Sequence, residues 1–335
     1  AETVIPCNLN REVELHPVGK KAGYHPVPQE EINHLLIRLA RQGKRVARLK
    51  GGDPYVFGRG GEEAQALHKA GIPFEVIPCV TAATAVPGYA GIPVTHRQEV
   101  VTVSLVTAHE SSKVGGPQIR WDLLAQDKHS TLVGYMGVTS LPETVNRLLT
   151  AGMDPETPSA MIERGTTSRQ RVVRAGVADL PGAVLRSGIR PPALFVIGPA
   201  VKHAEQLDWF GSRPLLGERI LIPAGGEQSV VEALEMSGVE VVEVPLPVSS
   251  AARIVVSAAP LTGCIFRTAD EVEALEDERA LRNWGSEVVA FCVDEGAAAR
   301  ARDLGWARVE AVLDAPAGEE LVRRIGNCRV ETQRN

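Results

Sequence analysis

Arg48-Leu-Lys-Gly-Gly-Asp-Pro-Tyr-Val-Phe-Gly-Arg-Gly-Gly-Glu-Glu63 is the most informative stretch of this 335-residue chain. Its paired glycines, Gly51 and Gly52, let the backbone adopt positive φ and come close to a ligand. The stretch lacks the Gly-Lys-Ser/Thr ending of a phosphate-binding loop, and its glycine spacing is not that of a dinucleotide-binding turn. Gly-Gly-Asp-Pro taken alone is more typical of an ordinary strand-to-helix turn without a ligand, so the surrounding pattern has to decide.

The segments around this stretch alternate between helical and extended patterns. Ile32, Leu35, Leu36 and Leu39 share one face of a helix expected over 28–42, which Gly43 ends. Further helices are expected at 62–69 and 141–149, and strands at 45–49, 74–77, 100–107, 131–135, 171–174 and 193–197. Such alternation predicts an α/β protein. Because the strands are not uniformly apolar, we expect a mixed sheet with some antiparallel pairs.

A turn-rich segment at 207–217 precedes a second series of elements. Strands are expected at 219–223, 240–244, 254–257, 264–266 and 288–292, with a helix at 227–236. We therefore predict two domains, 1–211 and 212–335.

Composition narrows the class of protein. Hydrophobic residues make up 44% and charged residues 23% of the chain, and the net charge is −5, which does not favour nucleic acid as a partner. The five cysteines include no Cys-x-x-Cys pair, which argues against a disulfide framework and against a zinc site. No apolar run reaches the length of a membrane span. These features predict a cytoplasmic protein with no membrane and no metal requirement.

Taken whole, the stretch 48–63 resembles the signature segment of the uroporphyrinogen-III C-methyltransferases, which belong to the tetrapyrrole methylase family. Further similar segments lie at 18–25, 28–33, 71–78, 80–82, 89–97, 135–137, 163–166 and 170–171. The resemblance covers roughly residues 15–210. It implies the tetrapyrrole methylase fold, which has two α/β lobes with mixed sheets.

The resemblance also implies a reaction. Family members transfer methyl groups from S-adenosyl-L-methionine (SAM) to pyrrole-ring carbons of uroporphyrinogen III, and the product, precorrin-2, leads to sirohaem and cobalamin. Lys20 matches an acid-base lysine of the family, although by itself it fits a solvated surface lysine. The positions that match cofactor-contacting residues are Gly51, Gly52, Asp53, Val56, Thr81, Ala82, Met136 and Gly165. The sulfonium is already an activated electrophile, so no metal is expected.

The substrate is a polycarboxylate, and arginine forks suit carboxylates. Arg48, Arg59 and Arg97 lie in matching segments and are the candidates for substrate contacts, the alternative being ordinary surface arginines. His96 either joins them or is a loop histidine with no such role. The resemblance further implies a homodimer.

One departure from the family pattern shapes the expectations. Residue 1 enters the pattern shortly before Lys20, so we expect a fragment or a displaced gene start, lacking a βα unit plus a strand of about 40–50 residues. That segment would carry a glycine-rich loop and a catalytic aspartate in family members. An alternative to an active enzyme is therefore a catalytically impaired protein that binds SAM or the tetrapyrrole.

The second half resembles a different enzyme. The segments 213–223 and 238–245 resemble the opening of uroporphyrinogen-III synthase. Ala224 stands where that family usually has arginine, and the domain is about half the expected length. We expect a short, divergent, small α/β synthase-like domain, with a bifunctional synthase/methyltransferase as the alternative.

Overall fold

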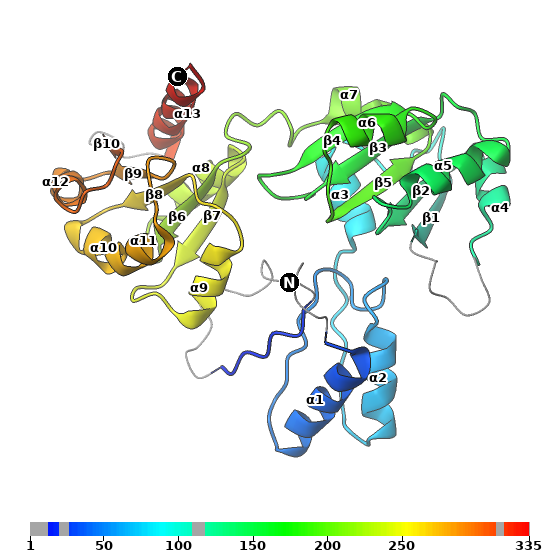
Figure 1. The fold of residues 1–335 in the computed structure, drawn as a ribbon, viewed down its shortest axis with the longest axis horizontal. Coiled ribbons are helices and arrows are strands. Elements are labelled where there is room, and N and C mark those ends of the chain that lie inside the picture. The colour runs from blue at the N-terminus through cyan, green and yellow to red at the C-terminus, as the bar shows by residue number, and fades with distance from the viewer. Residues whose placement is uncertain (1–12, 20–26, 109–117, 313–317, 335) are drawn as a thin grey trace. The chain divides into compact units, whose positions relative to one another are not determined.

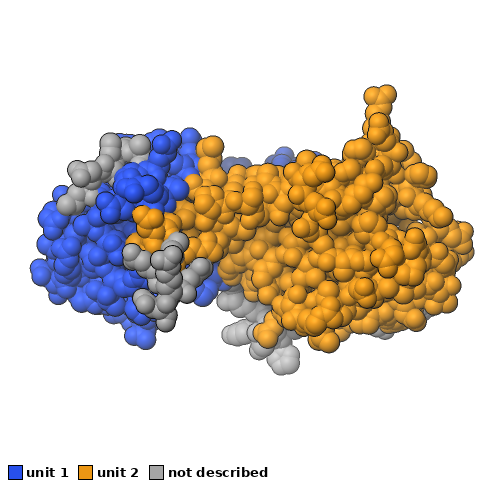
Figure 2. All heavy atoms as spheres, turned by 90° about the horizontal axis from the view of Figure 1, so that it is seen from above, with its two compact units in different colours: residues 1–80, 219–233, 241–324 blue, residues 81–218, 234–240, 325–335 orange. Residues whose placement is uncertain are grey.

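The computed structural model describes residues 13–19, 27–108, 118–312 and 318–334, whose elements are labelled in Figure 1. The chain forms two compact units, which Figure 2 shows in different colours. Unit 1 comprises residues 1–80, 219–233 and 241–324, and unit 2 comprises 81–218, 234–240 and 325–335. Helices alternate with strands through most of the chain, which confirms the predicted α/β class.

Unit 2 is built on a five-stranded mixed sheet with strand order β1-β2-β5-β3-β4. Strands β1 and β2 are parallel, whereas β5 is antiparallel to β2 and β3, and β4 is antiparallel to β3. The predicted mixed sheet is thus confirmed. The elements are α3 (Ala82–Tyr89), β1 (Thr102–Thr107), α4 (Trp121–Gln126), β2 (Ser130–Tyr135), α5 (Leu141–Thr150), β3 (Pro158–Glu163), β4 (Arg171–Gly176), α6 (Leu180–Arg186), β5 (Ala193–Ile197), η2 (Pro199–His203) and α7 (Ala204–Leu207).

Alternating side chains of this sheet enter two separate cores. Leu132 and Phe195 pack with residues of α4, α5 and α6 on one face. Val133 and Val196 pack with residues of α3, η2 and α7 on the other face. Successive residues of a strand point to opposite faces, so central strands covered on both faces are apolar throughout. This burial fixes the ends of β2 and β3, where several predicted site residues lie.

Unit 1 contains a second five-stranded sheet, ordered β10-β9-β8-β6-β7. The pairs β6–β8, β8–β9 and β9–β10 are parallel. Its elements are β6 (Arg219–Pro223), α8 (Gln228–Met236), β7 (Glu240–Val244), α9 (Ser250–Ser257), β8 (Gly263–Phe266), α10 (Ala269–Ala274), α11 (Glu276–Arg282), β9 (Val289–Cys292), α12 (Glu295–Asp303), β10 (Val309–Ala311) and α13 (Gly318–Arg334). The limits of the units cut through three of these elements. The end of α8, the first residue of β7 and the second half of α13 fall in unit 2.

Unit 1 also contains α1 (Gln29–Arg41) and α2 (Gly60–Lys69), which contact each other. Ile32, Leu36 and Leu39 are the buried apolar residues of α1, as its helical spacing predicts. The strands predicted at 45–49 and 74–77 are wrong, because both segments are assigned neither helix nor strand. A β-branched or aliphatic run becomes a strand only when a neighbouring strand pairs its backbone, and local pattern does not supply that partner.

The strand predicted at 254–257 is also wrong, since these residues complete helix α9. Ser249 caps the helix by accepting a hydrogen bond from the Ala252 backbone N–H at 3.1 Å. At the other end, the buried guanidinium of Arg219 donates to the carbonyls of Val255 and Ala259, both at 2.8 Å. These caps satisfy helix-terminal groups and outweigh the strand preference of the Ile-Val-Val run.

None of the described helices is both long enough and apolar enough to cross a membrane.

Candidate functional site

The Gly-Gly-Asp-Pro loop of unit 1 is shaped by Asp53. Its Oδ1 accepts a hydrogen bond from the Tyr55 N–H at 2.8 Å, and its Oδ2 accepts one from the Cys79 N–H at 3.1 Å. These backbone donors, Cys79 foremost, lower the pKa of the Asp53 carboxyl below its ordinary value. Gly52 has φ of 127°, a conformation that favours glycine. Asp53 therefore organises the loop with both of its carboxylate oxygens.

A buried carboxylate, Glu63, anchors the two ends of the same loop. Lys50 lies 3.0 Å from Glu63 Oε2 and also donates to the Gly58 carbonyl. Arg48 Nε lies 3.3 Å from Glu63 Oε1, and Gln29 donates to that oxygen at 3.1 Å. A buried carboxylate is tolerated when its oxygens are paired in this way. Arg48, a predicted substrate contact, is thus placed in the network that holds the loop.

Arg59 and Phe57 carry unusual backbone angles at the end of this loop. Their φ values are 58° and 52°, in the left-handed region that is uncommon for residues other than glycine. The Arg59 guanidinium pairs with the Glu62 carboxylate, with Nε to Oε2 at 2.9 Å, and its side chain is 52% exposed. This pairing raises the pKa of Arg59. Arg59, a predicted substrate contact, therefore lies at the surface of unit 1.

In unit 2, Tyr135 lies at the N-terminus of α3. Its hydroxyl shares a hydrogen bond with the Thr81 hydroxyl and accepts one from the Ala83 N–H at 2.9 Å. The first N–H groups of a helix have no partner within the helix and carry partial positive charge. The last residue of β2 thus joins the predicted cofactor residues Thr81 and Ala82.

The residues that follow β2 and β3 adopt strained backbone conformations. Met136 has φ of 55°, Arg164 of 48° and Thr166 of 68°. Each non-glycine residue in this region costs about 1–3 kcal/mol, and such residues gather at functional sites. Met136 is also 57% exposed, which is unusual for a large apolar side chain directly after a buried strand. Met136 and the glycine between Arg164 and Thr166 are both predicted cofactor positions.

Gly165 packs directly against α3. A Cβ atom at this position would lie 2.3 Å from Val86 Cγ1, so only glycine permits the observed approach. Gln170 holds the same loop, because its Oε1 accepts from the Thr166 N–H at 2.9 Å and its Nε2 donates to the Tyr89 carbonyl at 3.0 Å. The loop after β3 is therefore fixed to the middle and to the C-terminal end of α3.

The predicted site residues fall into two groups. Thr81, Ala82, Met136 and Gly165 lie in unit 2, where Tyr135 bonds to Thr81 and Ala83 at the start of α3 and Val86 of the same helix packs on Gly165. Gly51, Gly52, Asp53 and Val56 form the loop of unit 1, where the Val56 N–H donates to the Asp53 carbonyl at 3.3 Å. Arg97 is exposed in a turn of unit 2. Lys20 lies outside the described residues.

Three residues that organise these groups are not among the predicted site residues. Tyr135 and Gln170 stood in matching segments, but their partners lie 52 to 81 residues away in sequence. Glu63, the last residue of the signature stretch, is 4% exposed and holds the loop. Only Tyr135 carried a signal in the sequence, since it is a polar residue that stands next to Gly134 at the end of an apolar run.

Comparison with protein families identifies the class of protein. Residues 4–181, more than half of the chain, match the model of the "Tetrapyrrole (Corrin/Porphyrin) Methylases". The chain belongs to the tetrapyrrole methylase family.

Similar curated proteins carry a more specific name. The chain is 47% identical over 206 residues to a siroheme synthase of Methylobacillus flagellatus, which covers 62% of this chain and 44% of that protein. It is 52% identical over 203 residues to siroheme synthase 3 of Aeromonas hydrophila, which covers 61% of this chain and 42% of that protein. The chain therefore spans less than half the length of these relatives.

Among solved structures, a uroporphyrin-III C-methyltransferase from Thermus thermophilus is 43% identical, with a TM-score of 0.46 over 55% of this chain and 76% of that chain. A cobalt precorrin-4 methyltransferase is 29% identical, with a TM-score of 0.48 over 54% of this chain and 73% of that chain.

Proposed function

We propose that this protein transfers methyl groups from SAM to uroporphyrinogen III and forms precorrin-2, a step towards sirohaem. Family membership supports tetrapyrrole methylation. The observation that carries the proposal for this chain is the attachment of two loops to helix α3 in unit 2: Thr81 bonds to Tyr135, which precedes the strained Met136, and Gly165 packs against Val86. Backbone strain is retained where a ligand has to be positioned.

SAM supplies a methyl group on a sulfonium, which makes that carbon electrophilic. The contribution of the chain is to bind and to orient. Thr81 and Tyr135 place hydroxyl groups at the positive end of α3, where a carboxylate is favoured. The exposed Met136 suits a ligand that lies along the backbone, and the packing of Gly165 on Val86 holds the neighbouring loop against α3. Orientation of reacting atoms is a large part of catalysis for such a transfer.

The loop around Asp53 in unit 1 is proposed as a cofactor-contacting segment in its own right, through the backbone of Gly51, Gly52 and Val56. Its support is the order that Asp53 imposes, with two backbone N–H groups on one carboxylate. Lys20 is proposed to handle the proton on the tetrapyrrole. Arg97 and Arg59 are proposed to bind substrate carboxylates, and Arg48 acts through Glu63 on the loop.

A methyl-transfer assay tests this function. The chain is incubated with uroporphyrinogen III and SAM labelled in the methyl group, and the label is followed into the tetrapyrrole. We expect transfer that Lys20→Ile reduces while binding of S-adenosylhomocysteine is kept. Equal loss of both by Lys20→Ile counts against its role in proton transfer. Absence of transfer by the folded chain, with S-adenosylhomocysteine still bound, favours the binding-only alternative.

The second half of the chain is proposed to be a divergent uroporphyrinogen-III synthase-like domain from residue 212 onward, without synthase turnover. Arg267, at the end of β8, donates to the carbonyls of Pro223 and Ala224 at 3.1 and 3.2 Å, and it pairs with Glu271. The backbone carbonyls at the end of β6 are thus hydrogen-bonded to a side chain of the same domain. Conversion of hydroxymethylbilane to uroporphyrinogen III by the intact chain would replace this proposal with the bifunctional one.

The homodimer and the cytoplasmic location stay predictions. Light scattering of the purified chain tests the first.

A further inference from the structure

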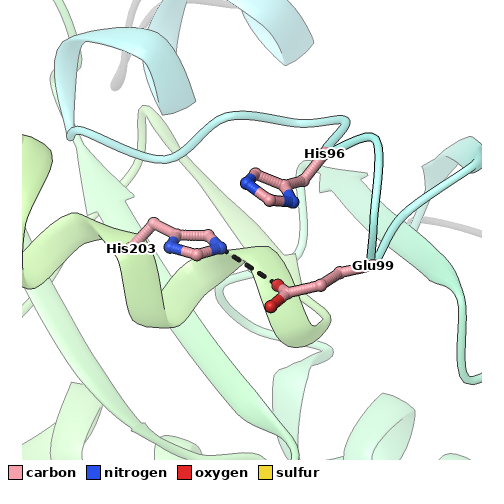
Figure 3. A group of neighbouring side chains, drawn as sticks. All are labelled: His96, Glu99 and His203. Carbon is pink, nitrogen blue, oxygen red and sulfur yellow. Dashed lines mark hydrogen bonds and ion pairs between the residues drawn. The ribbon is translucent and has the colours of Figure 1, made fainter.

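His96, Glu99 and His203 form a cluster in unit 2 that the proposed methyl transfer does not use. Their ligand atoms all lie within 4.8 Å of one another, and Figure 3 shows the two imidazole rings beside the Glu99 carboxylate. His203 Nε2 lies 3.0 Å from Glu99 Oε2. The two rings stack with centroids 4.6 Å apart and an interplanar angle of 21°. Two imidazoles and one carboxylate are a donor set typical of transition-metal sites.

Tight local structure fixes the first two members of the cluster. His96 and Val100 exchange backbone hydrogen bonds of 3.1 and 2.8 Å, and the Glu99 N–H donates to the His96 carbonyl at 2.9 Å. Both side chains therefore project from one short hairpin turn. His96 Nδ1 is buried and has no hydrogen-bond partner among the described residues. An unsatisfied buried nitrogen of this kind calls for a ligand, because desolvation without a partner is unfavourable.

The third member comes from a distant segment that is also well anchored. His203 ends η2, and its neighbours Val201 and Ala204 are buried in the same core as α3. The side chains of Glu99 and His203 are 26% and 22% exposed, so an ion reaches them from solvent. Because both backbones are fixed, the three donors stay close together without a bound ion. Such a preformed arrangement lowers the cost of ordering on binding.

We propose that His96, Glu99 and His203 bind a divalent transition-metal ion, with Zn²⁺ as the reference ion and water completing the coordination. Tetrahedral zinc–nitrogen bonds of about 2.1 Å place two ligand atoms about 3.4 Å apart. The widest separation in the cluster therefore closes by about 1–1.5 Å, which needs the rings to rotate out of their stack. The ion replaces the direct contact between His203 Nε2 and Glu99 Oε2, and both residues then bind the ion instead.

Lys202 pairs with the second oxygen of the Glu99 carboxylate. Its Nζ lies 2.7 Å from Glu99 Oε1, so one carboxylate oxygen is already neutralised. The imidazoles then supply most of the affinity. Mg²⁺ and Ca²⁺ prefer oxygen ligands, whereas Zn²⁺ and Co²⁺ accept imidazole readily. The reaction chemistry does not call for a metal, and the cysteine spacing does not predict a zinc site. The proposed ion has no part in methyl transfer, and its two histidines lie far apart in sequence.

The test is calorimetric titration of the full-length, tag-free, chelator-treated chain with Zn²⁺, together with absorption spectra of the Co²⁺ form. We expect one Zn²⁺ per chain, competition by Co²⁺ but not by Mg²⁺, and visible cobalt bands without a thiolate charge-transfer band. His203→Gln and Glu99→Gln each remove a ligand and should weaken binding by about 100-fold or more.

His68→Gln, an exposed histidine of α2, is the matched control and should bind as the parent does. Cys79→Ser, which removes the exposed thiol, should also leave binding unchanged. Circular dichroism checks that each variant is folded. Absence of Zn²⁺ binding by the parent overturns the proposal. So does equal affinity of the parent and folded Glu99→Gln, or loss of the cobalt bands in Cys79→Ser.

Discussion

The two five-stranded sheets of this protein end in different ways. In unit 2, the residues after β2 and β3 include Met136, Arg164 and Thr166, all with positive φ. Among the described residues 219–312, which include the second sheet, Asn283 alone of the non-glycine residues has positive φ, and it is the C-cap of α11. Asparagine tolerates that conformation, so its cost there is small.

The difference in positive-φ residues shows which sheet has strained loops and which has ordinary turns. The second sheet ends in relaxed loops, as expected when loops only connect elements. The first sheet keeps three strained residues next to positions that resemble cofactor contacts. Because each costs about 1–3 kcal/mol, the surrounding packing has to hold them in place. Variants that alter the strained loops should therefore change ligand binding more than matched variants elsewhere.

Gly165→Ala should have the largest effect. The new Cβ of residue 165 would lie 2.3 Å from Val86 Cγ1, so the two side chains would overlap. Overpacking of this kind costs about 1–3 kcal/mol in stability. The shift of the loop should also weaken S-adenosylhomocysteine binding by at least about 10-fold, since about 1.4 kcal/mol is a factor of 10. Denaturant unfolding and calorimetry measure the two effects. Gly88→Ala is the matched control, because no atom lies within 4 Å of its Cβ position; an equal loss in both variants would contradict this account.

Tyr135→Phe should have the next largest effect. It removes the acceptor of the Ala83 N–H and the partner of the Thr81 hydroxyl at the start of α3. Loss of one such hydrogen bond costs about 1 kcal/mol in stability. We expect the free energy of S-adenosylhomocysteine binding, measured by calorimetry, to fall by a similar amount, about 1 kcal/mol. Tyr55→Phe, at a ring that is 58% exposed, should leave stability unchanged; a similar loss there would show that the effect is not specific to α3.

Met136→Gly tests strain directly. Glycine adopts positive φ without steric cost but loses more entropy on folding, so the net stabilisation should be about 0.5–1 kcal/mol. Binding of S-adenosylhomocysteine should weaken at the same time, because the exposed side chain is lost. Thermal unfolding and calorimetry are the readouts. Asn283→Gly, the matched change after α11, should alter neither by a measurable amount. A destabilised Met136→Gly variant would remove the argument from strain.

Asp53→Asn should have the smallest effect, and one that depends on pH. The folded-state pKa of Asp53 lies below its ordinary value of 3.8 because the Cys79 and Tyr55 N–H groups stabilise the carboxylate. The group therefore contributes stability that is present above pH 3.8 and is lost as the pH falls through the folded pKa. Thermal midpoints of the parent and of Asp53→Asn should differ at neutral pH and converge in acid. A difference that persists below that range would assign the effect to packing.

The sequence predicted the regular elements well where burial repeats a simple pattern. The apolar run at 193–197 and the strand at 219–223 both form central strands, as their composition indicated. The run at 254–257 was misassigned because its helix depends on Arg219, a residue on a different strand. Local preference carries no information about such a cap.

The candidate site was predictable only as far as the resemblance reached. Thr81, Met136 and Gly165 were named from matching segments, but nothing local showed that Tyr135 joins the first two or that Val86 meets the third. Likewise, Glu63 became an anchor only once Lys50 and Arg48 were placed beside it. Contacts between distant segments are set by the topology of the sheet, which periodicity does not encode.

Calorimetric titration of the folded 335-residue chain with S-adenosylhomocysteine shows whether this chain binds the cofactor product. We expect saturable binding of one ligand per chain, with Gly165→Ala weakened and Gly88→Ala unchanged. A folded sample that binds no S-adenosylhomocysteine would contradict this expectation.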